Sequence, residues 1–101
     1  MARREIVFTR TSAKQRRAIL EYWTKRNGST KYARKLIRIS NEHLKVISDF
    51  PESFRETELS GIHESAMGHF SIYYRFTEST IIVMAFWDNR QDPAKLLDAI
   101  K

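Results

Sequence analysis

The chain has 101 residues, so we expect one domain over residues 1–101. It has no cysteine, which excludes disulfides and thiolate zinc sites, and its three histidines lack metal-motif spacing, so we expect no cofactor. No apolar stretch has the length of a membrane span or forms a signal-peptide core, which predicts a cytoplasmic protein with no membrane partner. The net charge of +6 favours an acidic or polyanionic partner.

The first part of the chain predicts a strand and then a helix. Residues 6–8 form a short β-like run, and Ser12 with Gln15 has the spacing of a capping box that would begin a helix. The helix should end at Asn27-Gly28, a pair that tolerates left-handed backbone geometry.

A second helix should follow after only a few residues. Ser29 or Thr30 can cap it, and Phe50-Pro51 should end it. The short connection requires the two helices to form an antiparallel hairpin. Most of their Lys and Arg residues lie opposite the apolar stripe, where solvation alone explains them. Their excess over acidic residues still leaves one side positive, a plausible docking surface for RNA or an acidic peptide.

The second half of the chain has the two-residue period of strands. Residues 54–59 could form an irregular or edge strand, and residues 69–76 alternate cleanly. Phe70, Ile72, Tyr74 and Phe76 should face the helices. A polar turn over 77–80 leads into residues 81–87, which are apolar on both faces and predict a central strand.

The chain should close with a short helix over residues 94–100, because Asp92 and Pro93 match a helix N-cap and its first position. The fold class is therefore α+β. An N-terminal strand, an antiparallel helical hairpin packed on a small antiparallel sheet, and a short C-terminal helix make up the expected domain.

Polar residues gather at the end of the last predicted strand and on the outer face of the one before it. A tight turn between the strands could bring together His69, Ser71, Tyr73, Arg75, Asp88 and Arg90. Arginine could bind phosphate, tyrosine could stack on a base and histidine could transfer a proton. The alternative is a solvated outer face without chemistry.

Two further sets of residues have competing interpretations. His63-Glu64, in a segment between two glycines, could provide a general base, but loop histidines are more often exposed and without function. Tyr22 and Trp23 could mark a binding patch, although aromatic residues at helical spacing usually belong to a core.

The order of these elements, with Gly68 opening the Phe70 to Arg75 run and a last strand ending in Asp88-Asn89-Arg90, resembles the RelE/ParE superfamily of bacterial type II toxins. The resemblance implies a growth-inhibiting toxin neutralised by a cognate antitoxin. RelE-like members cleave mRNA on the ribosome, and ParE-like members inhibit DNA gyrase. Operator DNA would be contacted only through the antitoxin.

The resemblance also assigns roles to residues. Arg90 matches the family's phosphate-stabilising arginine at the end of the last strand, whereas Ser71 and Leu96 stand where RNA-cleaving members usually have an arginine and a tyrosine. A rearranged site would use Arg90, His69 and Arg75 in catalysis, with Tyr73, Ser71 and Asp88 binding substrate. The long hairpin over residues 12–50 is more similar to the ParE branch. Ribonuclease activity and gyrase inhibition are both open, as is a non-catalytic RNA-binding or scaffold module.

Overall fold

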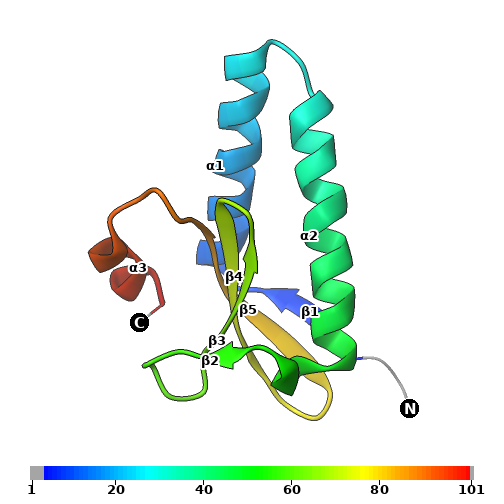
Figure 1. Ribbon diagram of the computed structural model, residues 1–101, viewed down its shortest axis with the longest axis vertical. Coiled ribbons are helices and arrows are strands. Elements are labelled where there is room, and N and C mark those ends of the chain that lie inside the picture. The colour runs from blue at the N-terminus through cyan, green and yellow to red at the C-terminus, as the bar shows by residue number, and fades with distance from the viewer. Residues whose placement is uncertain (1–3, 101) are drawn as a thin grey trace.

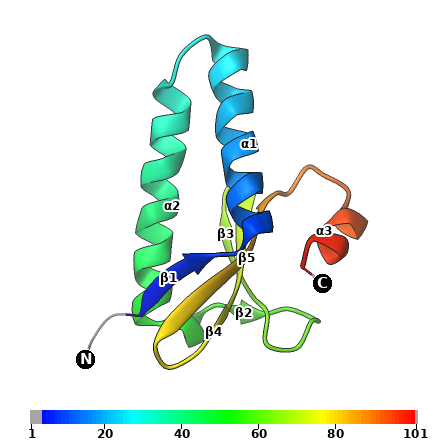
Figure 2. The same ribbon diagram turned by 180° about the vertical axis from the view of Figure 1, so that it is seen from behind.

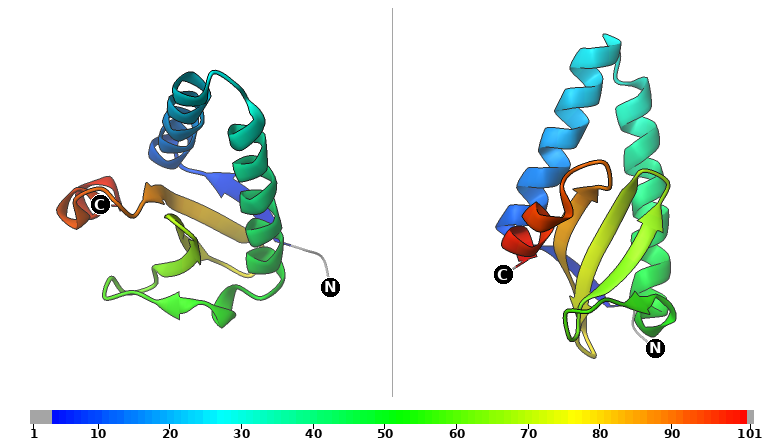
Figure 3. Two further views of the ribbon diagram at one scale, coloured as in Figure 1. Left: turned by 45° about the horizontal axis from the view of Figure 1, so that its top comes forward. Right: turned by 60° about the vertical axis from the view of Figure 1, so that its left-hand side comes forward.

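A computed structural model describes residues 4–100, which form one five-stranded sheet with helices on both faces (Figure 1). In chain order, the elements are β1 (Glu5–Phe8), α1 (Arg10–Asn27), α2 (Lys31–Asp49), a 3-10 turn η1 (Pro51–Ser53), β2 (Arg55–Glu56), β3 (His63–Met67), β4 (Phe70–Phe76), β5 (Thr80–Asp88) and α3 (Pro93–Ile100). The α1–α2 hairpin covers one face and α3 lies against the other (Figure 3). The predicted α+β class is confirmed.

The sheet has the order β1-β5-β4-β3-β2 and is mixed rather than wholly antiparallel. β1 runs parallel to β5, with Glu5 opposite Thr80 and Phe8 opposite Val83, as can be followed from behind in Figure 2. The other pairs are antiparallel. The apolar run at residues 6–8 does not indicate whether β1 pairs parallel or antiparallel with its neighbour. That direction depends on the path of the chain from β1 into the helical hairpin.

The N-terminus of α1 lies one turn before the predicted capping box, so that prediction was wrong. Thr9 is the N-cap, and its Oγ1 accepts a hydrogen bond from the Ser12 backbone N–H at 3.1 Å. The Ser12 hydroxyl instead donates to the carbonyl of Val83 at 2.8 Å, and the Gln15 side-chain oxygen accepts from the Phe86 N–H at 2.9 Å. These side chains hydrogen-bond to β5 where its neighbour β1 has ended.

The remaining helix boundaries agree with the sequence prediction. Gly28 ends α1 with φ +61°, a left-handed conformation that suits glycine, and α2 ends before Pro51. The apolar stripe of α2 packs on the sheet in the main core. The strands contribute fully buried residues to this core, among them Tyr74, whose hydroxyl donates to the carbonyl of Pro51 at 2.7 Å.

β3 was not predicted, and residues 54–59 contain only the two-residue strand β2. The sequence of β3 is largely polar, so its strand character depends on partners that a local pattern cannot reveal. Its full length pairs with β4, from His63 opposite Tyr74 to Met67 opposite Phe70. Gly68, at φ +67°, begins the turn that joins the two strands.

The face of the sheet away from the hairpin is covered, not solvated. A bulge lies where Tyr73 pairs with Ala85 but Tyr74 pairs with Val83, so β5 gains one residue there. Ile100 and Leu96 of α3 pack on this face in a second core. Tyr73 belongs to this core and is 8% exposed, and its neighbour on the same strand face, Ser71, is 0% exposed, so the predicted open polar face is wrong for both. None of the helices described over residues 4–100 is long and apolar enough to cross a membrane.

Candidate functional site

An arginine clamp, formed by Asp88, Arg90, Trp23 and Phe70, lies at the end of β5 on the face of the hairpin. The Asp88 carboxylate accepts from Arg90 Nε at 2.9 Å and Nη2 at 2.7 Å, and also from the Arg90 backbone N–H at 2.9 Å. The guanidinium carbon lies 5.3 Å from the centre of the Trp23 ring and 5.9 Å from that of Phe70. Ion pairing and cation–π contact therefore fix the orientation of Arg90.

The clamp leaves Arg90 partly available to a partner. The guanidinium has five N–H donors, of which Asp88 takes two, and half of the side chain is exposed. The hydrogen bond from Arg90 lowers the pKa of Asp88 despite the opposing effect of burial, so the carboxylate stays ionised. The charges of this pair cancel, which weakens the field that Arg90 can exert on a phosphate.

A pocket of about 390 Å³ adjoins the clamp between α1 and the end of β5. Its lining includes Gln15, Ile19, Tyr22, Trp23, Arg90 and Gln91. Tyr22 is 54% exposed and packs edge-on against Trp23, with ring centres 5.1 Å apart. Trp23 in turn contacts Tyr32 of α2 at 5.1 Å. The pocket thus presents an aromatic wall beside a fixed guanidinium.

A separate polar network, centred on Glu64, lies on the opposite face of the sheet beneath α3. Glu64 Oε2 accepts from the Ser71 hydroxyl and the Tyr73 hydroxyl, each at 2.9 Å, and Oε1 accepts from Arg55. The Asn89 side chain donates to Ser71 Oγ at 3.0 Å, which connects the network to the end of β5. Three strands (β2, β3 and β4) and the β5–α3 turn are therefore connected through one carboxylate.

The hydrogen bonds of this network determine its protonation. Burial raises the pKa of Glu64, but the hydrogen bonds from Arg55, Tyr73 and Ser71 outweigh it, so the pKa is lowered overall. Burial, and then the hydrogen bond to Glu64, raises the pKa of Tyr73 to about 12. Tyr73 is a neutral hydrogen-bond donor near pH 7 and a poor source of a phenolate base.

The six residues expected to converge do not form one site. Asp88 and Arg90 meet on the hairpin face, whereas Ser71 and Tyr73 meet on the α3 face. His69 lies exposed in the β3–β4 turn, where its carbonyl accepts from the Asn89 N–H at 2.8 Å. Arg75 is exposed opposite Ile82, six residues along from His69, which is about 20 Å at 3.4 Å per residue.

The His63-Glu64 pair is not a catalytic dyad, because consecutive strand residues point to opposite faces. His63 Nδ1 donates to the carbonyl of Phe54 at 2.9 Å, and its ring stacks on Tyr74 with centres 5.5 Å apart. These contacts give His63 a structural role. The prediction that these two residues lie in a loop was wrong, since they begin β3.

Sequence reasoning missed two members of these arrangements. Trp23 was considered with Tyr22 as a binding patch, but the core interpretation was preferred. It also forms the floor of the clamp, and its spacing of three and four residues from other apolar positions does not separate these roles. Glu64 was considered only as a partner of His63. Its observed partners Ser71 and Tyr73 lie on β4, and the pairing register of β3 and β4 brings them next to it. Across residues 4–100, no group of three His, Cys, Asp or Glu residues is arranged to hold a metal.

The solved structures that share this fold include two from toxin–antitoxin systems. One is from the chromosomal ParDE toxin–antitoxin system of P. aeruginosa, with TM-score 0.71, 19% identity, and coverage of 84% of this chain and 95% of the other. The second is from the RelBE2 toxin–antitoxin complex of Mycobacterium tuberculosis, with TM-score 0.59, 13% identity, and coverage of 86% and 99%. No curated protein sequence matches the chain significantly. The chain therefore shares the fold seen in these two structures.

The family comparison is more specific. The model of the ParE toxin of the type II toxin–antitoxin system parDE matches residues 6–93, from β1 to the start of α3. The chain belongs to this ParE toxin family, and the resemblance to the RelE/ParE superfamily is confirmed.

Proposed function

We propose that this protein inhibits growth by binding DNA gyrase, and that it does not cleave mRNA. The observation that carries the proposal is the pairing of Arg90 with Asp88 at 2.7 and 2.9 Å. A phosphorane in RNA cleavage needs uncompensated positive charge where negative charge develops. Here the expected cation is already paired with a carboxylate in the unbound protein.

The other groups required for cleavage support the same conclusion. Proton transfer needs an acid and a base within hydrogen-bond reach of the ribose and the leaving oxygen. Ser71 and Tyr73 are buried and donate to Glu64, while the exposed His69 and Arg75 lie at opposite ends of β4. Leu96 has an aliphatic side chain at the position where, by the resemblance, RNA-cleaving members usually have a tyrosine. Within residues 4–100, no acid, base and unpaired cation converge.

The pocket beside the clamp has the composition of a protein-binding surface. Tyrosine, tryptophan and arginine are the residues most enriched among those that dominate interface energetics. Tyr22, Trp23 and Arg90 combine all three, with the guanidinium held in place before a partner arrives. Such preorganisation reduces the entropy lost on binding. We assign the contact with gyrase to this pocket.

A cognate antitoxin is the second expected partner. Both structural neighbours come from toxin–antitoxin systems, and the net charge of +6 suits an acidic antitoxin segment. Co-expression with that antitoxin should restore growth and yield a complex that co-purifies. Operator DNA would be recognised by the antitoxin partner.

The mechanism is tested in cells that express the native chain, Tyr22→Ala or Arg75→Ala. The native protein should induce the SOS response while primer extension finds messages intact. Tyr22→Ala should lose both toxicity and SOS induction, because an interface tyrosine is removed. Arg75→Ala, the control at the far end of β4, should retain both.

Codon-phased message cuts without an SOS response would contradict gyrase inhibition and favour ribosome-dependent cleavage. A specific feature supports that alternative: the Asn89–His69 backbone hydrogen bond holds an exposed histidine near the end of β5. In that case His69→Gln should abolish the cuts.

A further inference from the structure

The positive charge of the chain is concentrated in the outer half of the helical hairpin. Residues 22–41 contain six Lys or Arg and no Asp or Glu, while the rest of the chain has 12 basic and 12 acidic residues. This segment therefore contains the whole net charge of +6. Its basic residues are Lys25, Arg26, Lys31, Arg34, Lys35 and Arg38.

All six side chains are exposed, and within residues 4–100 none of them is in an ion pair or side-chain hydrogen bond. Like charges at this density repel one another and destabilise the hairpin slightly. The segment itself contains no acid, and the nearest ones, Glu21 and Glu42, lie at its two ends, one turn from Lys25 and Arg38. An external polyanion would relieve this repulsion.

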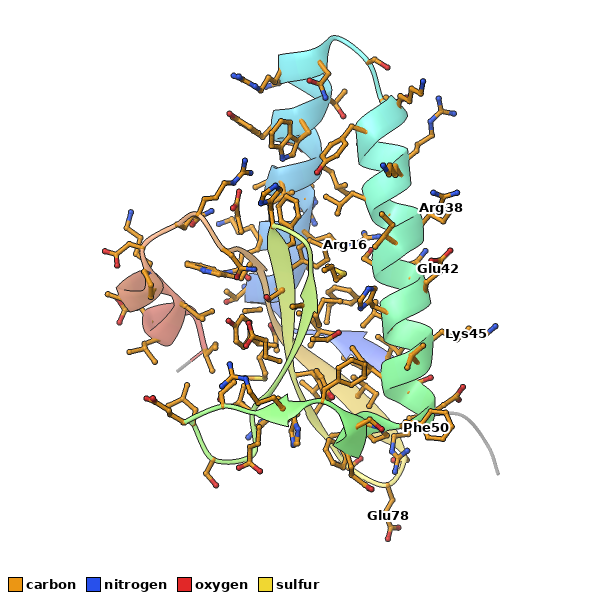
Figure 4. The ribbon with its side chains drawn as sticks, viewed as in Figure 1. Arg16, Arg38, Glu42, Lys45, Phe50 and Glu78 are labelled. Carbon is orange, nitrogen blue, oxygen red and sulfur yellow. The ribbon has the colours of Figure 1, made fainter. Side chains whose placement is uncertain are left out.

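Four of these residues form a basic stripe on α2: Lys31, Arg34, Lys35 and Arg38. Their spacings of three, four and seven residues place them on one side of the helix, opposite the stripe that packs on the sheet. Figure 4 shows Arg38 pointing away from α1, with Glu42 below it. The outer half of the hairpin stands clear of the sheet (Figures 1 and 3), so the stripe is open to a large ligand.

The surroundings of the stripe favour a nucleic acid over a protein segment. A broad hollow beside it is lined by the four basic residues together with Asn27, Ser29 and Tyr32. The exposed large apolar side chains lie elsewhere, including Val46 on the lower part of α2 and Phe50 directly after the helix. An amphipathic peptide would find only Tyr32 and the alkyl parts of the basic side chains as apolar contacts here, whereas phosphates need only charge and hydrogen-bond donors.

The aromatic residues favour a duplex over a single strand. Single-stranded nucleic acids bind by stacking bases on free aromatic faces. Tyr32 lines the hollow but is half-buried and packs against Trp23, 5.1 Å away. We propose that the basic stripe binds the phosphate backbone of duplex DNA without sequence preference. If the proposed function holds, this duplex would be the DNA on which gyrase acts, distinct from an operator.

Anisotropy of a labelled 20-base-pair DNA duplex, titrated with the full-length purified chain, measures this contact directly. Four phosphate contacts predict a log–log salt slope of about −3.6, or about 150-fold weaker binding at 200 mM than at 50 mM salt. Arg34→Gln should reduce the slope by about 0.9. A variant with all four stripe residues changed to Gln should lose the salt-dependent binding.

The matched control changes Arg10, Lys14, Arg17 and Lys45 to Gln, which removes the same charge from exposed hairpin positions outside the segment. It should bind almost as the native chain does. Equal loss in both variants would overturn the proposal in favour of net charge alone, and tighter binding of a single strand would overturn the preference for a duplex. Loss of antitoxin binding with unchanged DNA binding in the stripe variant would make the stripe a protein-docking surface.

Gyrase inhibition is measured separately on the same proteins. DNA binding by the native chain without gyrase inhibition would reject the proposed function and retain the DNA contact. Gyrase inhibition by the native chain, together with DNA binding that is absent or independent of the stripe, would retain the proposed function and reject the DNA contact. Circular dichroism melting of each variant identifies any loss of fold. If the fourfold variant does not fold, the single Arg34→Gln variant still tests the proposal through the change in the salt slope of DNA binding.

Discussion

Removal of the Glu64 carboxylate should destabilise the fold by about 2–6 kcal/mol. Glu64→Ala leaves the Tyr73 hydroxyl and the Ser71 hydroxyl proton without their acceptor on a buried face, at about 1–3 kcal/mol for each unpaired group. Loss of the Arg55 ion pair adds less than about 1 kcal/mol, because Arg55 is exposed. Urea unfolding at pH 7, followed by tryptophan fluorescence, measures the change.

A double-mutant cycle tests the reasoning behind this value. Tyr73→Phe in the native chain should cost about 1.5 kcal/mol, since it removes a hydrogen bond to a charged acceptor. In the Glu64→Ala background the same change should cost nothing or stabilise, because the hydroxyl has already lost its partner. Additivity of the two changes within about 0.5 kcal/mol would refute the network.

The network also predicts a pH dependence. Folding lowers the pKa of Glu64 below its ordinary value near 4.5, so the unfolded chain binds its proton more readily. The stabilisation is complete above the unfolded pKa and is lost as pH falls toward the folded pKa. The difference in unfolding free energy between the native chain and Glu64→Ala should therefore shrink below about pH 4.5. A difference that grows on acidification would contradict the assigned shift.

Three other substitutions test separate parts of the account. Ser12→Ala should lower stability by about 1 kcal/mol in urea unfolding, because the Val83 carbonyl loses its 2.8 Å donor; an unchanged midpoint would mean that this contact contributes nothing. Tyr74→Phe should cost a similar amount by leaving the buried carbonyl of Pro51 without its donor, and a stabilising effect would contradict this. His69→Gln should leave toxicity and thermal stability unchanged, whereas loss of toxicity alone would support the histidine-based nuclease.

Local sequence patterns correctly predicted the helix ends and the strand alternation that local interactions determine. The Asn27-Gly28 helix end, the Phe50-Pro51 stop and the alternation along β4 each depend on a few neighbouring residues. The α1 start was wrong by one turn because Ser12 and Gln15 hydrogen-bond to β5, more than 70 positions away in sequence. A capping-box pattern cannot distinguish a cap from such a distant contact.

The candidate site was harder to predict because it depends on faces and register. The sequence correctly indicated Asp88 and Arg90 as strand-end neighbours, and the structure pairs them. It did not reveal that α3 packs over Tyr73, since a short amphipathic helix can pack on either face of a sheet, nor that Ser71 hydrogen-bonds to Glu64 and Asn89. Consequently, residues that alternate on one strand face became a buried network rather than an open active site.

The most direct test of the central claim is a supercoiling assay with purified gyrase, relaxed plasmid and ATP. The native chain should inhibit supercoiling near stoichiometric concentration, and Tyr22→Ala should require at least about tenfold more protein, equivalent to about 1.4 kcal/mol of lost binding. Full supercoiling at every concentration of the native chain, combined with codon-phased cleavage of ribosome-bound mRNA, would contradict the account.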